Sequence, residues 1–111
     1  MASNGDRREA TRWALHDKQV ALARYLQELL SNESEDPDLV RIEFGRAKIE
    51  LELTFSILSE LTSGQPIQLP DDATIAALRT SVAALSQAIG ASSSVNALIA
   101  AADKVIKVWP D

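Results

Sequence analysis

Signals that start and stop helices divide this chain into four segments, and this division constrains the fold more than any other feature. Asp36 precedes Pro37, and the pair is typical of an N-cap followed by the first residue of a helix. Gly64, with Pro66 two residues beyond it, is typical of a helix C-terminus. The same reasoning along the chain predicts four helices, at about residues 6–31, 37–62, 71–90 and 92–109.

Apolar residues recur at helical spacing within these segments. Leucines of the first segment are seven, four and three residues apart, and the third segment repeats every three or four residues. We therefore expect an all-α fold, an antiparallel four-helix bundle of two long helices and two shorter, alanine-rich ones. It would form one domain over residues 1–111, with a flexible start at residues 1–5. The apolar stripe of the first segment is Leu15, Leu22, Leu26 and Leu29, and that of the third segment is Ile75, Leu78, Val82, Leu85 and Ile89.

One stretch of the second segment alternates apolar and polar residues as a strand does. It reads KIELELTFSIL over residues 48–58, and the VRIEF before Gly45 alternates as well, so a β-hairpin over residues 39–57 is an alternative. We find no third strand, and an isolated hairpin is marginally stable. The helix signals at both ends of the segment favour a helix, because a glycine inside it costs only about 0.5–1 kcal/mol.

The hairpin alternative also has a sequence resemblance behind it. RIEFGRAKIELELTF, residues 41–55, resembles the hairpin of the trypsin-co-occurring domains found in bacterial conflict systems. Membership of that family would imply a small adaptor module rather than an enzyme. The helical second half of the chain departs from the family's pattern.

Read as a helix, the second segment carries two apolar stripes, because alternate residues fall on nearly opposite sides at about 100° per residue. The charge-free stripe is expected to face the bundle core. The second stripe is interrupted by Arg46 and Glu60, and either the bundle buries it as well or it is an interface. The charge-free stripe is Val40, Phe44, Ala47, Leu51, Phe55 and Leu58; the second stripe is Leu39, Ile42, Ile49, Leu53 and Ile57; and Glu43, Glu50 and Thr54 separate them on one side.

The second stripe is the candidate binding site for a protein partner. Self-association is the simplest use, since homodimers are the commonest assemblies. An exposed tryptophan is a common interface anchor, although Trp13 has the alternative of packing against Trp109. A small acidic helical binder of this kind fits an adaptor, a chaperone, an immunity protein or an antitoxin. The predicted partner-binding residues are Leu39, Ile42, Arg46, Ile49, Leu53, Ile57, Trp13 and Val20.

Charge and composition argue against other classes of function. The net charge is −5, and residues 25–72 hold eleven acidic residues against three basic ones, which argues against nucleic acid as a partner. Without cysteine and with one histidine the chain lacks the ligands of a zinc site, and the missing cysteines fit a reducing cytoplasm. It has no membrane-length apolar run, no secretory signal and no phosphate-binding loop. We expect a cytoplasmic protein that is not an enzyme, without a cofactor, a small-molecule substrate or a membrane partner.

One tripeptide leaves a second function open. Leu15, His16 and Asp17 read LHD, which resembles the phosphoacceptor tripeptide of some histidine-kinase dimerisation domains. The resemblance implies that His16 takes a phosphoryl group while the adjacent acid assists. The arginine that the family places just before the tripeptide is displaced here to Arg12. The alternative function is therefore a phosphotransfer bundle with His16 as phosphoacceptor.

Overall fold

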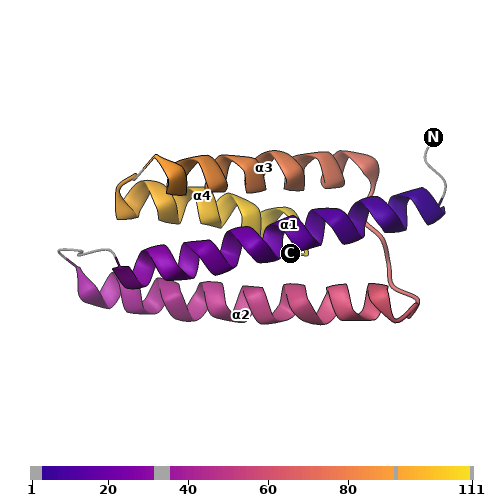
Figure 1. The fold of residues 1–111 in the computed structure, drawn as a ribbon, viewed down its shortest axis with the longest axis horizontal. Helices are drawn as coiled ribbons and strands as arrows, with labels where there is room; N and C mark the ends of the chain where they lie inside the picture. The colour runs from indigo at the N-terminus through magenta and orange to yellow at the C-terminus, as the bar shows by residue number, and fades with distance from the viewer. Residues whose placement is uncertain (1–3, 32–35, 92, 111) are drawn as a thin grey trace.

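The computed structural model describes residues 4–31, 36–91 and 93–110, and within them it has four α-helices and no strand. The expected all-α bundle is thus confirmed. The two long helices lie antiparallel, and the two shorter ones cover the opposite side of α1 (Figure 1). The helices are α1 (Asn4–Ser31), α2 (Pro37–Thr62), α3 (Asp72–Gly90) and α4 (Val95–Val108).

Side-chain caps explain where three of the helices begin. The Asp36 carboxylate accepts a hydrogen bond from the Leu39 backbone N–H at 3.1 Å, with Pro37 in the first turn. Asp71 caps α3 and Ser94 caps α4 in the same way. At the other end of α2, Gly64 has φ +80°, a left-handed conformation that favours glycine.

α1 begins earlier in the chain than was expected. α1 already includes Asn4 and Gly5, which were expected to belong to a flexible start. The rest of that start, residues 1–3, lies outside the described residues, as does Ser92, where the fourth helix was expected to begin.

The hairpin alternative over residues 39–57 is wrong. α2 is helical from Pro37 to Thr62, so the resemblance of residues 41–55 to a hairpin has no counterpart in the fold. The alternation arises because a helix with two apolar stripes places apolar residues on both of its sides. Caps at both ends of the segment outweigh the small cost of Gly45 in its middle.

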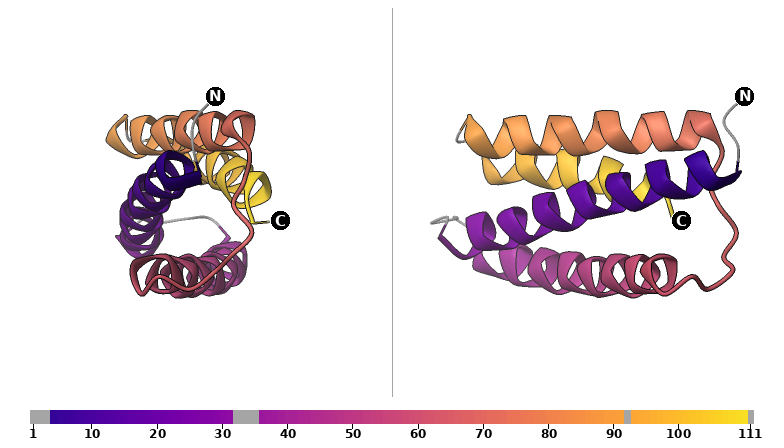
Figure 2. Two further views of the ribbon diagram at one scale, coloured as in Figure 1. Left: turned by 90° about the vertical axis from the view of Figure 1, so that its right-hand side faces the viewer. Right: turned by 45° about the vertical axis from the view of Figure 1, so that its right-hand side comes forward.

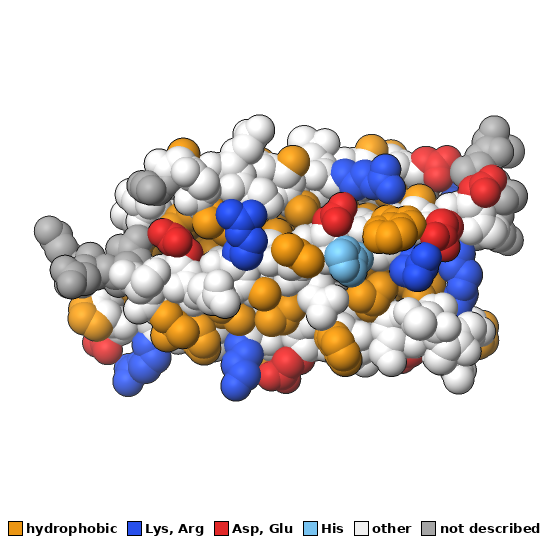
Figure 3. Space-filling view, in the orientation of Figure 1, with side chains coloured by type: hydrophobic (Ala, Val, Ile, Leu, Met, Phe, Trp, Pro, Cys, Tyr) orange, Lys and Arg blue, Asp and Glu red, His pale blue; other side chains and the backbone are white. Residues whose placement is uncertain are grey.

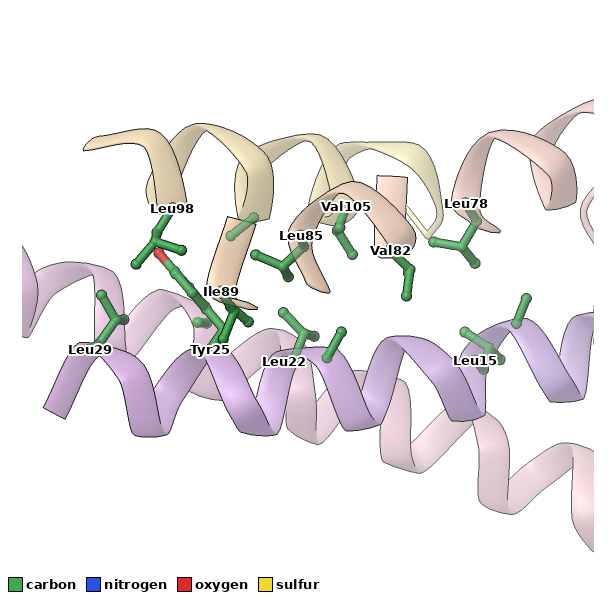
Figure 4. Close-up of a cluster of buried hydrophobic side chains, with 14 of the residues drawn as sticks. Leu15, Leu22, Tyr25, Leu29, Leu78, Val82, Leu85, Ile89, Leu98 and Val105 are labelled. Carbon is green, nitrogen blue, oxygen red and sulfur yellow. The ribbon is translucent and has the colours of Figure 1, made fainter. Parts of the chain in front are cut away.

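Most of the buried apolar core lies between α1, α3 and α4, and α2 contributes Ala47 and Leu61 to it, with half-buried apolar side chains packed against it. The end-on view shows α3 and α2 on opposite sides of the bundle, with α1 and α4 between them (Figure 2, left). α2 packs along α1 and more lightly on α4, and within the described residues it does not reach α3. Figure 4 shows side chains of α1 pointing towards α3 and α4. The larger buried apolar residues there are Leu15, Leu22, Tyr25, Leu29, Ile75, Leu78, Val82, Leu85, Ile89, Leu98 and Val105.

Candidate functional site

The innermost residues of α2 are mainly polar, with half-buried apolar side chains beside them. The buried residues of α2 are Glu43, Ala47, Glu50, Thr54 and Leu61, so the residues expected to separate the two apolar stripes lie innermost. Most of the charge-free stripe does face the core, as expected, because the half-buried Val40, Phe44, Leu51 and Leu58 pack against it together with Ala47. Of its members only Ala47 is fully buried. Phe55 is 60% exposed, and hydrophobic side chains line the boundary between α1 and α2 (Figure 3).

Lys18 of α1 explains why polar residues of α2 lie innermost. Its side chain is fully buried, and its Nζ donates hydrogen bonds to Glu50 Oε1 at 2.8 Å and to the Trp109 carbonyl oxygen at 3.1 Å. Burial lowers the pKa of Lys18, while the hydrogen bond and the charge of Glu50 act to raise it. A buried ammonium without a counter-ion would be very costly, so Glu50 has to face inwards.

Tyr25, two turns further along α1, makes the second polar contact. Its hydroxyl donates to Glu43 Oε1 at 2.9 Å, and burial followed by the nearby Glu43 carboxylate raises the pKa of Tyr25. Arg46 donates to both Glu43 oxygens, at 2.6 and 3.1 Å, and to Asp103 Oδ1 of α4 at 2.8 Å. The contacts among these side chains join α2 to α1 and α4. We call Lys18, Tyr25, Glu43, Arg46, Glu50 and Asp103 the polar seam.

Asp103 closes the seam at the surface of α4. It accepts from Arg46 and forms an ion pair with Lys107, also at 2.8 Å. The hydrogen bonds from Lys107 and then Arg46 hold the pKa of Asp103 below its usual value. The pKa of Arg46 is raised, first by its hydrogen bond to Glu43.

A sign of the polar seam is present in the sequence, although the two stripes of the second segment do not indicate it. Lys18 lies three residues after Leu15 and four before Leu22, which places a charged residue on the leucine stripe of α1. Lys18 and Tyr25 are seven residues apart, as are Glu43 and Glu50, so two antiparallel helices bring both pairs into contact together. A lysine on an apolar stripe indicates that an acidic partner lies on a neighbouring helix.

Most of the second stripe lies on the outside of α2. Ile42, Ile49 and Leu53 are 66%, 68% and 42% exposed, whereas Leu39 and Ile57 are half-buried. Arg46, a predicted partner-binding residue, forms ion pairs with Glu43 and Asp103 of its own chain. We call Ile42, Ile49 and Leu53, together with Gly45 between the first two and Ser56 one turn after Leu53, the outer face.

The two predicted residues of α1 lie on a different surface. Trp13 is half exposed; its Nε1 donates to Glu9 Oε1 at 3.0 Å, and the Arg12 guanidinium lies 5.3 Å from the centre of its ring. The ring contacts of Trp13 among the described residues are with Arg12 and His16, and Trp109 packs instead against the apolar core. Val20 lines a groove between α1 and α3, a helix that α2 does not reach in the described residues. The structure therefore does not bring Trp13 and Val20 together with the outer face.

His16 is exposed on the same side of α1, where Figure 3 shows its ring on the surface. Its Nδ1 is 3.7 Å from Asp17 Oδ1, and its ring meets the edge of Trp13 with centroids 5.8 Å apart. Arg79 of α3 lines the groove that His16 and Asp17 also line. A phosphoryl group on His16 would be accessible to solvent and close to a cation on the neighbouring helix.

The described residues contain no group of three or more His, Asp and Glu side chains placed to hold a metal ion. None of the helices, over the residues described, has the length and apolar character needed to cross a membrane. Comparison of the chain with protein-family models, with curated proteins and with solved structures finds no match.

Proposed function

We propose that this chain is a non-enzymatic protein–protein interaction module that self-associates through the outer face of α2. One observation carries the proposal: α2 directs Glu43 and Glu50 inwards to the polar seam and leaves Ile42, Ile49 and Leu53 exposed. A helix docked on a bundle ordinarily does the reverse. Exposed apolar residues of this kind on one helix face fit a contact with another protein.

The energetics of the outer face fit association. Fully burying an isoleucine or leucine side chain is worth about 1.5–3 kcal/mol. The outer face offers three such residues from each copy, to set against an association cost of roughly 4–15 kcal/mol. A contact made by one helix from each copy should therefore give a dimer that dissociates on dilution.

The first test is the molar mass in solution, measured by light scattering on a sizing column over a dilution series. We expect a dimer at high concentration and a monomer on dilution. Ile49→Lys combined with Leu53→Lys should abolish the dimer and leave the helix content by circular dichroism unchanged. Phe55→Lys is the matched control, because Phe55 is similarly exposed but belongs to the charge-free stripe and not to the outer face.

Each outcome of this test decides something. A strict monomer at every concentration would contradict self-association. Loss of the dimer in both the double variant and Phe55→Lys would place the contact elsewhere than on the outer face. Unfolding of the double variant would show that Ile49 and Leu53 are needed within the chain.

A phosphotransfer bundle that uses His16 is the second candidate function. It is supported by the exposure of His16, by Asp17 beside it and by Arg79 in the same groove. Incubation with phosphoramidate, a small phosphodonor, tests it by intact mass and by the acid lability of phosphohistidine. A phosphoryl group that is lost in His16→Ala would favour this function over the interaction module.

A further inference from the structure

Gly45 in the middle of α2 is not required by anything in its own chain. A glycine in a helix interior is destabilising relative to alanine, and Gly45 does not have the positive φ that would favour it. A Cβ added there would meet no atom within 4 Å. Gly45 lies three residues after Ile42 and four before Ile49, on the outer face. A glycine at this place allows a second backbone to approach closely.

Lys48 and Glu52 supply the charge pattern beside this face. They are exposed, one turn apart, on the same edge of the outer face. Neither forms an ion pair within the described chain. When two copies of a helix pair antiparallel about a two-fold axis, equivalent edges meet, so Lys48 of each copy would face Glu52 of the other. In a parallel pair, Lys48 would instead lie near Arg46 of the other copy.

We propose that two copies pair through α2 in antiparallel orientation, about a two-fold axis near residue 50. In this register Ile49 of each copy packs against Ile49 and Leu53 of the other, and Leu53 also lies over the other copy's Gly45. Lys48 and Glu52 form two reciprocal ion pairs at the edge. This inference rests on the proposed function and gives that interface its partner, orientation and register.

Cysteine cross-linking tests the orientation, because the natural chain has no cysteine to interfere. Ile49→Cys should form a disulfide-linked dimer with itself when the folded protein is oxidised. Ile42→Cys should not, because its two copies would lie roughly 24 Å apart along the helix at 1.5 Å per residue, far beyond the span of a disulfide. A mixture of Ile42→Cys and Ser56→Cys should cross-link, whereas Ser56→Cys alone should not.

The ion pairs are tested separately by charge reversal. Lys48→Glu should raise the dissociation constant of the dimer about tenfold, because it places four carboxylates at the edge. Lys48→Glu combined with Glu52→Lys should restore the dissociation constant to near its original value. A double variant as weak as the single one would overturn the proposed register.

The cross-linking separates failure of the orientation from failure of the proposed function. Ile42→Cys dimers that form as readily as Ile49→Cys dimers would overturn the antiparallel pairing and leave self-association through α2 standing. A dimer seen by light scattering in which no α2 cysteine cross-links would overturn the α2 interface altogether. A monomer at every concentration, with no cross-link, would overturn both.

Discussion

Lys18 and Glu50 form a buried ion pair, 2.8 Å long, that joins α1 to α2. The lysine side chain is fully buried, and its remaining hydrogen bond goes to the Trp109 carbonyl oxygen. Removing two charges from water is costly, and the pair offsets this cost only when both partners are present. The contact between α1 and α2 therefore depends on a specific match as well as on apolar packing.

We expect Lys18→Met to lower the free energy of unfolding by roughly 3 kcal/mol, because it leaves the Glu50 carboxylate buried without its counter-ion. Urea unfolding followed by circular dichroism measures this change. Lys18→Met combined with Glu50→Met is the matched control and should recover most of the loss. A single variant as stable as the natural chain would show that water already reaches Glu50.

Tyr25→Phe should lower the free energy of unfolding by about 1.5 kcal/mol. The change removes only the hydroxyl that donates to Glu43, and hydrogen bonds to charged groups are worth roughly 1.5–3 kcal/mol. Arg46 keeps the Glu43 carboxylate paired, which limits the loss. The same urea experiment applies, and an unchanged dependence on urea concentration would show that the fold is otherwise intact. No loss of stability would contradict a role for this hydrogen bond.

Stability should fall in acid partly through Asp103. Its pKa is lower in the folded chain, first because of Lys107 and then Arg46. The folded state therefore binds fewer protons here than the unfolded state, so the stabilisation is complete above the unfolded pKa of about 4 and is lost as the pH falls through the folded pKa. Unfolding midpoints from about pH 2 to pH 7 should show this decline. Asp103→Asn should be less stable at pH 7 and show a smaller decline in acid; an equal decline would contradict the assignment.

Gly45→Ala should have opposite effects on the fold and on the dimer. At concentrations where the chain is monomeric, it should raise the free energy of unfolding by about 0.5–1 kcal/mol, because the added Cβ meets open space. The same change should raise the dissociation constant of the dimer, since it separates the two backbones. Urea unfolding of dilute protein and light scattering measure the two effects, and a variant that associates more tightly would contradict close approach at this position.

The limits of the helices could be predicted because each depends on local chemistry. Asp36 with Pro37, and Gly64 with its left-handed backbone, act within a few residues of their own position. The rotation of α2 about its axis could not be predicted in the same way. Both of its stripes are apolar enough to be core, and the deciding contacts come from Lys18 and Tyr25, more than fifteen residues away in the sequence.

The candidate site was predicted to a similar extent. The exposure of Ile42, Ile49 and Leu53 agrees with a stripe that the bundle does not bury, while their role in binding remains a prediction. The spacing of residues within α2 gives no information about Asp103, which lies on α4 and forms an ion pair with Arg46. Contacts between distant segments therefore determine which residues of α2 lie innermost and which partners hold Arg46.

The polar seam also sets the alignment of α2 along α1. Apolar side chains beside the contact between two helices allow one helix to slide along the other by one turn, because another apolar residue follows three or four positions later. Such a slide would bring Ala47 or Thr54 opposite Lys18 and leave a buried charge unmatched, at a cost of several kcal/mol. The seam thus selects one alignment among several that hydrophobic contacts alone would permit, and so fixes the position along α1 at which α2 presents its outer face.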